Sequence, residues 1–415
     1  MSFIRTLRRL RLYWFQVPWC VPPWGSKELR AGVNCMLRGT VVAGRDGARF
    51  AASVRESVGR RFAIPVSRGR DALWLALRAL DLGPEDEVIV PSYVCGSVPE
   101  AVRMAGARVR WADVGERLVV TLDNIRPAIS PRTRCVIVPH LFGNTAPLET
   151  IEPFLGERGV VLIDDAAQAF GMRRAGRPLG SFGQFGVVCG GPGKPLVAPA
   201  GGVLLTDDPE LFRRAATIPL PPPQTAVTLR RFAGFWFWRR WRRYTAILEA
   251  ARDRIWPQAE PADSTPGTIA NLDAALLFSQ WERFESIRQC RSHRATRMRA
   301  LLHPLHWKDV SDPAVDGAPL KLILLLPEDG PPMQEVLDAF AVAGVECQCG
   351  YIPCHLKDRT ESTPVLPFSE QIWARVLCIP LDTDLLNAGP LKRLSTRWPR
   401  TGALIGCDAA DTYSG

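Results

Sequence analysis

Short apolar runs alternate with amphipathic stretches through the first half of the chain. Three runs rich in β-branched residues have the pattern of buried strands: EVIVP from Glu87, CVIVP from Cys135 and VVLI from Val160. Between such runs, residues 73–80 place their apolar side chains on one helical face, and this helix begins just after Gly69. The alternation predicts an α/β fold with a mostly parallel sheet.

The second half of the chain has a different pattern. A long helical periodicity follows Gly267, and KLILLLP, MQEVLDAFAVAG and VLCIPL then predict a smaller α+β C-terminal unit. The proline-rich LPPPQ marks a break before it. We therefore divide the chain into a basic N-terminal segment and connector (1–30), a large domain (31–218), an Arg/Trp-rich insert (219–262) and a small C-terminal domain (263–415).

Two segments combine arginines with apolar and aromatic residues. Residues 3–15, FIRTLRRLRLYWF, form a short amphipathic helix with four arginines opposite an apolar stripe, suited to a membrane interface or to docking on its own protein. Residues 230–244 place six arginines among seven aromatic residues. This mixture suits a membrane interface, internal packing or stacking on single-stranded nucleic acid. We favour contact with the membrane surface and expect no nucleic-acid partner.

Composition narrows the class of protein. A chain of 415 residues with 47% apolar and 23% charged residues is an ordinary globular mixture, and its net charge of +10 favours anionic partners. No run reaches the roughly 18 apolar residues of a membrane span, and the N-terminus lacks the apolar core of a secretory signal. The eleven cysteines lack paired CxxC spacing, which indicates reduced thiols and a cytoplasmic location, on the inner face of the membrane if the surface contact forms. The cluster Cys347, Cys349, Cys354 and His355 matches no common zinc module, and we expect no metal.

The candidate chemistry centres on Lys194. Only six of the 52 basic residues are lysines, and Lys194 is the only one between residues 28 and 307. An amine can form a Schiff base, whereas a guanidinium cannot. The strand from Val160 ends at Asp164 and Asp165, where ligands bind in open α/β sheets, and a carboxylate there can keep a pyridinium nitrogen protonated. Asp165 is the better placed, with Gln168 one turn further on if a helix begins here; the alternative is a helix-capping aspartate.

Several motifs in order carry a family resemblance. IDDAAQAFG, SFGQFGVV and GPGKPLVAPAGG resemble segments of the DegT/DnrJ/StrS-type sugar aminotransferases, a family of fold type I that uses pyridoxal phosphate (PLP), and the resemblance runs from about Phe62 to about Leu394. It implies that the large domain binds PLP, with Lys194 as the Schiff-base lysine. Asp165 would be the partner of the pyridine nitrogen and Gln168 the contact to the ring hydroxyl.

The chain departs from the family at the ends of the cofactor. Gly69 matches the phosphate-binding turn before a helix, but Arg70 replaces the family's threonine and could hold the phosphate itself. Cys95 stands where an aromatic residue stacks on the ring, and Tyr93 could compensate from nearby. Cys189 replaces a serine that contacts the phosphate, and Gly191 replaces a histidine. These departures imply a rebuilt phosphate site.

The resemblance also implies a reaction and partners. The amino donor would be glutamate and the acceptor a keto sugar, nucleotide-linked, in the synthesis of cell-surface polysaccharide or secondary metabolites, by a homodimer. Tyr351 and His355 would lie on the substrate side, and Asn271 is a counterpart of an asparagine that reaches the neighbouring subunit. His140 follows a strand and we expect a structural role. The alternative function is a catalytically weakened scaffold that acts as a membrane-associated or regulatory partner.

Overall fold

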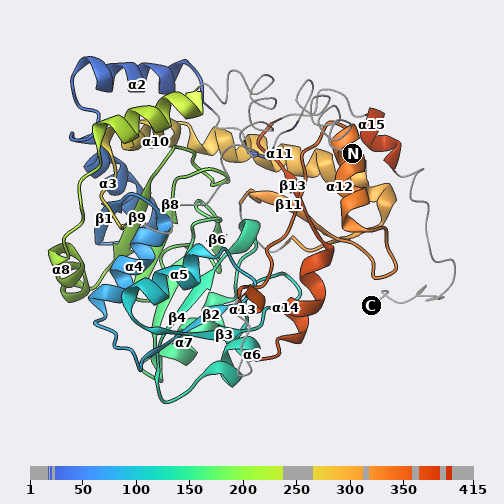
Figure 1. Ribbon diagram of the computed structural model, residues 1–415, viewed down its shortest axis with the longest axis horizontal. Helices are drawn as coiled ribbons and strands as arrows, with labels where there is room; N and C mark the ends of the chain where they lie inside the picture. The colour runs from blue at the N-terminus through green and yellow to red at the C-terminus, as the bar shows by residue number, and fades with distance from the viewer. Residues whose placement is uncertain are drawn as a thin grey trace, which may run out of the picture.

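The structure is a computed structural model, and it describes residues 17, 19–20, 24–236, 265–311, 317–357, 364–383 and 389–394. Within these ranges the chain forms a large sheet flanked by helices and a second, smaller sheet, joined by a long helix (Figure 1).

Seven strands form the large sheet in the order β1-β9-β8-β5-β4-β2-β3. The neighbours from β3 to β8 are parallel, whereas β9 is antiparallel to both β8 and β1. The strands are β1 Phe62–Val66, β2 Glu87–Pro91, β3 Arg108–Ala112, β4 Thr133–Pro139, β5 Val161–Asp165, β8 Phe185–Cys189 and β9 Gly202–Thr206. The predicted α/β fold with a mostly parallel sheet is therefore confirmed.

Both faces of this sheet are buried, which explains the unbroken apolar runs in its strands. In β4, Cys135 and Ile137 pack into one apolar cluster, whereas Val136 and Val138 pack into another on the opposite face. The first face is covered by α4 Gly69–Ala79, α5 Ser97–Ala105 and α8 Pro209–Thr217. The second is covered by α3 Asp46–Val58, α7 Leu148–Gly156 and α10 Asn271–Trp281, with α2 Ser26–Leu37 packed outside α10.

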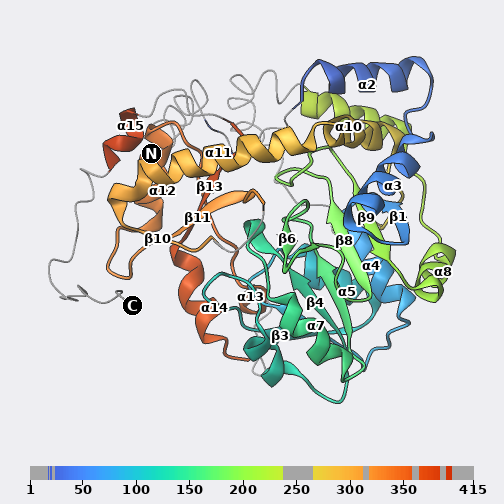
Figure 2. The same cartoon turned by 180° about the vertical axis from the view of Figure 1, so that it is seen from behind.

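A second sheet lies at the far end of α11 Phe284–Leu302, which extends from α10 along one side of the molecule (Figure 2). Its four strands are antiparallel, in the order β10-β11-β13-β12, and their apolar face packs on α11 and α12. The elements are β10 Lys308–Asp309, β11 Lys321–Leu325, α12 Met333–Val342, β12 Gln348–Cys349, α13 Cys354–Lys357, α14 Pro367–Ile372, β13 Val376–Pro380 and α15 Gly389–Lys392. Short elements elsewhere are α6 Leu122–Ile125, η1 Arg126–Ala128, η2 Leu141–Gly143, β6 Arg173–Arg174, β7 Arg177–Pro178, η3 His303–Leu305 and η4 Trp373–Arg375.

Two expected helices differ from the structure. The long helical pattern after Gly267 forms two helices, because α10 and α11 are separated by a turn at residues 282–283. The turn lets the Phe284 ring stack on Phe170 at 5.3 Å, over Gly171, where a Cβ would come within 2.5 Å of that ring. No helix begins after β5 either: residues 167–171 form consecutive turns.

The insert begins as a helix over residues 225–236 that packs inward. Its Phe232 and Phe235 rings lie 6.0 and 5.6 Å from the buried Trp24 ring. This part of the insert therefore packs internally. The predicted N-terminal helix (3–15) and the rest of the insert lie outside the described residues. No helix among the described residues is long and apolar enough to span a membrane.

The division into four segments stays a prediction. The boundary at residue 263 places α10 in the small domain, although α10 contacts α2 and α3 on the large sheet. The helix that leads to the second sheet is α11.

Candidate active site

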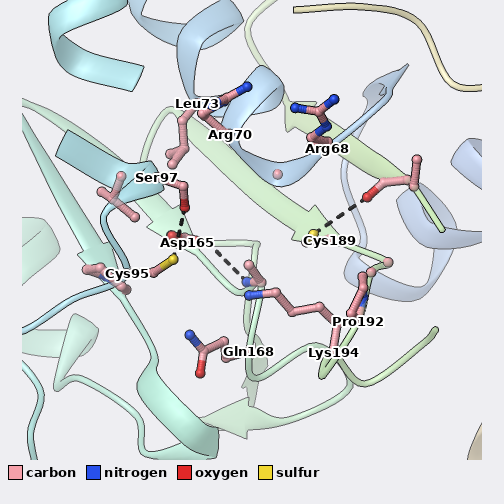
Figure 3. A pocket seen from close by; sticks show the side chains of 18 of the residues that line it. Arg68, Arg70, Leu73, Cys95, Ser97, Asp165, Gln168, Cys189, Pro192 and Lys194 are labelled. Carbon is pink, nitrogen blue, oxygen red and sulfur yellow. Dashed lines mark hydrogen bonds between the residues drawn. The ribbon is translucent and has the colours of Figure 1, made fainter. Parts of the chain in front are cut away.

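The carboxyl ends of β2, β5 and β8 meet at one edge of the large sheet, as parallel strands require. A cavity of about 440 Å³ opens at this edge. The seven residues that the sequence assigns to Schiff-base formation or cofactor binding line it (Figure 3): Gly69, Arg70, Cys95, Asp165, Gln168, Cys189 and Lys194. They come from four separate parts of the chain, so the fold brings together residues that the sequence holds more than a hundred positions apart.

Asp165 is the buried carboxylate of the cavity. It ends β5 and is only 5% exposed, and its Oδ1 accepts a hydrogen bond from the backbone N–H of Ala167 at 3.1 Å. Burial raises the pKa of the Asp165 carboxyl, and the nearby Lys194 ammonium acts in the opposite direction. The carboxylate can therefore hold a cationic group that enters the cavity.

Lys194 lies in the loop between β8 and β9. Its backbone N–H donates to the Gly191 carbonyl at 3.1 Å, which closes a turn just before the lysine. The side chain is half-buried and its amine extends toward Asp165 and Gln168 (Figure 3). The amine thus faces the centre of the cavity.

Gln168 is held by both ends of its amide. Its Oε1 accepts from the Phe142 backbone N–H at 3.1 Å, and its Nε2 donates to the Tyr351 hydroxyl at 3.1 Å. The rings of Phe142 and Tyr351 stack on each other at 5.5 Å. Phe142 has φ 59°, a left-handed conformation that L residues adopt at a cost and that aims its N–H at Gln168. These contacts fix the orientation of the carboxamide.

The N-terminus of α4 forms the other end of the cavity. A Cβ on Gly69 would lie 3.0 Å from the Cys189 Cβ, so glycine is needed for this close approach. The Cys189 thiol donates to the Gly201 carbonyl at 3.6 Å, and burial raises its pKa, so it is a neutral group here. The Arg70 guanidinium is held by Glu100 at 2.6 Å. The end of the cavity therefore combines helix N–H groups with a positioned cation.

Cys95 lies between β2 and α5, where its Sγ accepts a hydrogen bond from the Ser97 hydroxyl at 3.2 Å (Figure 3). The cavity is also lined by Ser97, Arg68, Glu100 and Arg231, none of which was expected there from the sequence. Arg68 directly precedes Gly69, so the sequence alone could have predicted that it lies beside the phosphate-binding turn. Arg231 comes from the insert, and its helix is held by the packing of Phe232 and Phe235 on Trp24.

Other expected site residues do not line this cavity. Tyr93 is fully buried and its hydroxyl accepts from the Tyr351 backbone N–H, so it does not replace the missing aromatic stack. His355 is also buried, with Nδ1 against the Ser92 hydroxyl and Nε2 against Glu370. Neither residue lines the cavity: the Tyr351 hydroxyl contacts Gln168 in its wall, and His355 joins the small domain to the large one, so their substrate-side role stays a prediction.

Asn271 is likewise occupied within its own chain. It is 3% exposed, its Oδ1 accepts from the Asp46 N–H at 2.8 Å, and its Nδ2 donates to the Thr40 carbonyl at 2.8 Å. These bonds join α10 to the start of α3. A role in a neighbouring subunit would require breaking them.

His140 lines the cavity at the end of β4, and its expected structural role stays a prediction. Its Nδ1 accepts from the Ala146 backbone N–H at 3.0 Å, so the other nitrogen, Nε2, carries the proton and donates to Asp164 at 3.0 Å. Asp164 also accepts from the N–H groups of Gly180 and Phe182. The His140–Asp164 pair joins the ends of β4 and β5 at the wall of the cavity, and Asp165 faces into it.

The groups of the cavity fit PLP. A volume of about 440 Å³ lies within the range of roughly 300–1,000 Å³ typical of cofactor sites. An amine can bind a carbonyl carbon, a buried carboxylate can hold a protonated ring nitrogen, and a helix N-terminus with nearby arginines can hold a phosphate.

The mostly parallel sheet and the lysine at its carboxyl edge define the class of protein, the PLP-dependent transferases of fold type I. A sequence profile of the DegT/DnrJ/EryC1/StrS aminotransferase family matches residues 24–390, and the chain belongs to this family.

Individual relatives agree with this assignment. The UDP-N-acetyl-3-dehydro-alpha-D-glucosamine 3-aminotransferase of Acidithiobacillus ferrooxidans is 37% identical over 190 residues, which is 45% of this chain and 52% of that protein. The chain thus matches about half the length of this curated relative.

Solved structures show the same fold. DesV of S. venezuelae, in complex with a ketimine intermediate, has a TM-score of 0.71 and 24% identity, covering 91% of this chain and 95% of its own. The GDP-4-keto-6-deoxy-D-mannose-3-dehydratase of E. coli, with bound hydrated PLP, has a TM-score of 0.73 and 16% identity, covering 92% and 99%. PseC of Helicobacter pylori, an aminotransferase involved in the biosynthesis of pseudoaminic acid, has a TM-score of 0.72 and 14% identity, covering 92% and 98%.

Proposed function

We propose that this chain is a PLP-dependent aminotransferase that transfers an amino group from glutamate to a nucleotide-linked keto sugar. The observation that carries the proposal is the placement of the Lys194 amine and the Asp165 carboxylate in one buried cavity. Membership of the family and the similarity to a UDP-sugar 3-aminotransferase support the reaction and the substrate class.

The bound cofactor supplies an electron-withdrawing ring that takes up the electron pair left when the α-proton of the amino donor is removed. Asp165 would hold the ring nitrogen in its protonated state, and its burial strengthens this contact. Gln168, fixed by Phe142 and Tyr351, would orient the ring through its hydroxyl. Lys194 would bind the cofactor covalently and, once displaced, move the proton at the reacting carbon.

The phosphate would lie at the N-terminus of α4. Backbone N–H groups after Gly69 and the guanidinium groups of Arg68, Arg70 and Arg231 provide positive potential around this end of the cavity. These positive charges would offset the loss of the two phosphate-binding hydroxyls, which the family's threonine and serine supply at positions 70 and 189. Arg68, Arg70 and Arg231 all line the cavity and are candidates for direct contact with the phosphate, and Glu100 orients Arg70.

Reconstitution with PLP tests the proposal. We expect a visible absorption band, and borohydride should fix the cofactor to the peptide that carries Lys194, as read by mass spectrometry. Lys194→Arg keeps the charge but cannot form the bond, so it should lose the label. Lys308→Arg, at an exposed lysine, should retain it. Label on Lys308 or Lys27 in the wild type, or no label, contradicts the assignment.

Addition of glutamate separates the enzyme from the weakened scaffold. An active aminotransferase loses its visible band when glutamate is added without an acceptor, and a UDP-linked keto sugar restores it. A scaffold retains the band in both steps. The departures at Cys95, Cys189 and Gly191 motivate this comparison.

We further propose that the chain forms a homodimer and contacts a membrane surface. Helix α2 supports pairing, because it exposes Leu29, Val33, Met36 and Leu37, the last at 81%. Light scattering on Leu37→Glu and on the double change Val33→Glu/Leu37→Glu should show monomers if α2 is the interface. A dimer retained by both variants excludes this helix.

A further inference from the structure

The N-terminal segment from Val17 to Trp24 connects the small sheet to the loop that carries Lys194. Residues 17, 19, 20 and 24 of this segment are described, and each of them has a backbone or side-chain contact with a distant part of the chain. The contacts fall into two groups.

The first group fastens the segment to the small domain. Val17 exchanges backbone hydrogen bonds with Gly344 at 3.0 Å and Glu346 at 2.9 Å. The Trp19 N–H donates to the Glu346 carboxylate at 2.9 Å. The buried Lys321 ammonium donates to the Trp19 carbonyl at 2.6 Å and lies 4.3 Å from the centre of its ring. The buried Lys321 cation, on β11, thus fastens Trp19 to the small sheet.

The second group fastens the lysine loop to the segment. The backbone N–H of Gly193 donates to the Cys20 Sγ at 2.9 Å, one residue before Lys194. The indole Nε1–H of Trp24 donates to the Val197 carbonyl at 2.8 Å, three residues after it. Gln280 completes this anchor, donating to the same carbonyl at 2.8 Å and accepting from the Val197 N–H at 3.0 Å. The lysine is thus held from both sides.

The loop needs such support because its own sequence is permissive. Residues 190–193 contain three glycines, and Gly193 has φ +67°. The prolines at 192 and 195 have no N–H, which removes two donors that could fasten the loop. Few interactions within the loop are therefore left to fix the backbone position of Lys194.

We propose that Cys20 is a positioning residue for Lys194, acting through the Gly193 N–H, and that the segment from Val17 to Trp24 couples the lysine loop to the small domain. This inference rests on the proposed function only in giving Lys194 a catalytic role. The loop contacts themselves are independent of it.

Hydrogen exchange of the cofactor-free protein tests the contact directly. Cys20→Ala removes the acceptor, and the Gly193 amide should exchange about tenfold faster, as expected for the loss of one hydrogen bond that limits local opening. Cys20→Ser restores an acceptor and should return exchange to within about threefold of the wild type. Cys290→Ala, at an exposed cysteine on α11, is the matched control and should leave the loop unchanged.

A second readout uses the PLP-loaded protein. The midpoint of the pH titration of the visible band should shift in Cys20→Ala and return in Cys20→Ser, because the band reports the surroundings of the Lys194 nitrogen. Unchanged Gly193 exchange in Cys20→Ala overturns the proposal, as does a Cys20→Ser variant that behaves like Cys20→Ala, since the thiol would then act by packing. Loss of wild-type PLP labelling with an intact exchange difference contradicts the proposed function alone.

Discussion

Asp164 and Asp165 are neighbours at the end of β5 with opposite surroundings. Asp164 is fully buried and its carboxylate accepts three hydrogen bonds, from His140, Gly180 and Phe182. Asp165 points into the cavity and faces Lys194. One carboxylate therefore stabilises the fold, and the other is available to a ligand.

This difference predicts separate effects for two substitutions. Asp164→Ala leaves three buried donors without an acceptor and should lower the free energy of unfolding by about 3 kcal/mol or more. Asp165→Ala should leave the melting temperature nearly unchanged and abolish transamination, with some cofactor still bound. Thermal melting and a transamination assay on both variants measure this. Full turnover in Asp165→Ala removes that carboxylate from the mechanism.

Asp273 predicts a pH dependence of stability. Burial raises the pKa of its carboxyl from 3.8 to about 7, with Arg231 acting in the opposite direction. The folded protein thus binds this proton more tightly than the unfolded chain does. The resulting stability is present below pH 3.8 and is lost as the pH rises through about 7.

The variant Asp273→Asn checks the sign. It should melt at a higher temperature than the wild type at pH 8, and the difference should shrink toward pH 4, since each pKa unit corresponds to about 1.4 kcal/mol. Asp329→Asn, at an exposed turn, is the control and should follow the wild type. If the wild type instead gains melting temperature relative to Asp273→Asn between pH 4 and pH 8, the prediction is wrong.

Single residues were predictable where local chemistry is distinctive. Lys194 stands out because lysine is scarce, and Asp165 because a strand ends there. A motif does not show that the Tyr351 and His355 side chains bond to Gln168, Ser92 and Glu370, so their substrate-side role stays a prediction. Arg231 was missed because its place depends on the packing of a whole helix.

At the scale of elements, apolar periodicity predicted the strands and most helices, and it failed where a turn interrupts a helical pattern. The turn between α10 and α11 interrupts a stretch whose apolar periodicity is helical on both sides. The stacking of Phe284 on Phe170 favours this turn. Contacts between aromatic residues that lie far apart in the sequence cannot be predicted from the local apolar pattern. The insert helix is another such case, since its inward packing depends on Trp24.

Two glycines test the packing of the insert helix on α2. A Cβ on Gly32 would come within 2.5 Å of the buried Phe232 ring, so Gly32→Ala should destabilise the protein by about 1–3 kcal/mol. Gly234, in the insert helix itself, has no atom of the described residues within 4 Å of its Cβ position, so Gly234→Ala should stabilise by about 0.5–1 kcal/mol. Thermal melting of both variants decides. A stable Gly32→Ala would mean that the helix does not pack on α2.

At the scale of the whole molecule, the net charge of +10 predicts reversible attachment to anionic membranes. Each basic residue near an anionic leaflet contributes on the order of 1 kcal/mol, and inserted tryptophans add to this. Trp236 packs with the core, so the aromatic residues to change are Trp238 and Trp241, which lie outside the described residues. The double change to serine should lower recovery in flotation with anionic liposomes.

Neutral liposomes and high salt provide the controls, since both remove the electrostatic attraction. Wild-type protein should float only with anionic liposomes at low salt. Equal recovery of the wild type and the double variant in the soluble fraction would contradict membrane attachment.

The anchors of the Lys194 loop have a consequence for biosynthesis. They join residues that are 83, 173 and 173 positions apart, and the segment that supplies two of them is fastened 327 positions further along. During synthesis on the ribosome, Cys20 and Trp24 emerge early. Their contacts with the lysine loop can form only after Val197 has been made, and the contacts of Gln280 and Glu346 form later still. Contacts of such long separation form late in folding. An incomplete chain that ends before Glu346 therefore carries the lysine but not its full support, which links the reactive amine to completed synthesis.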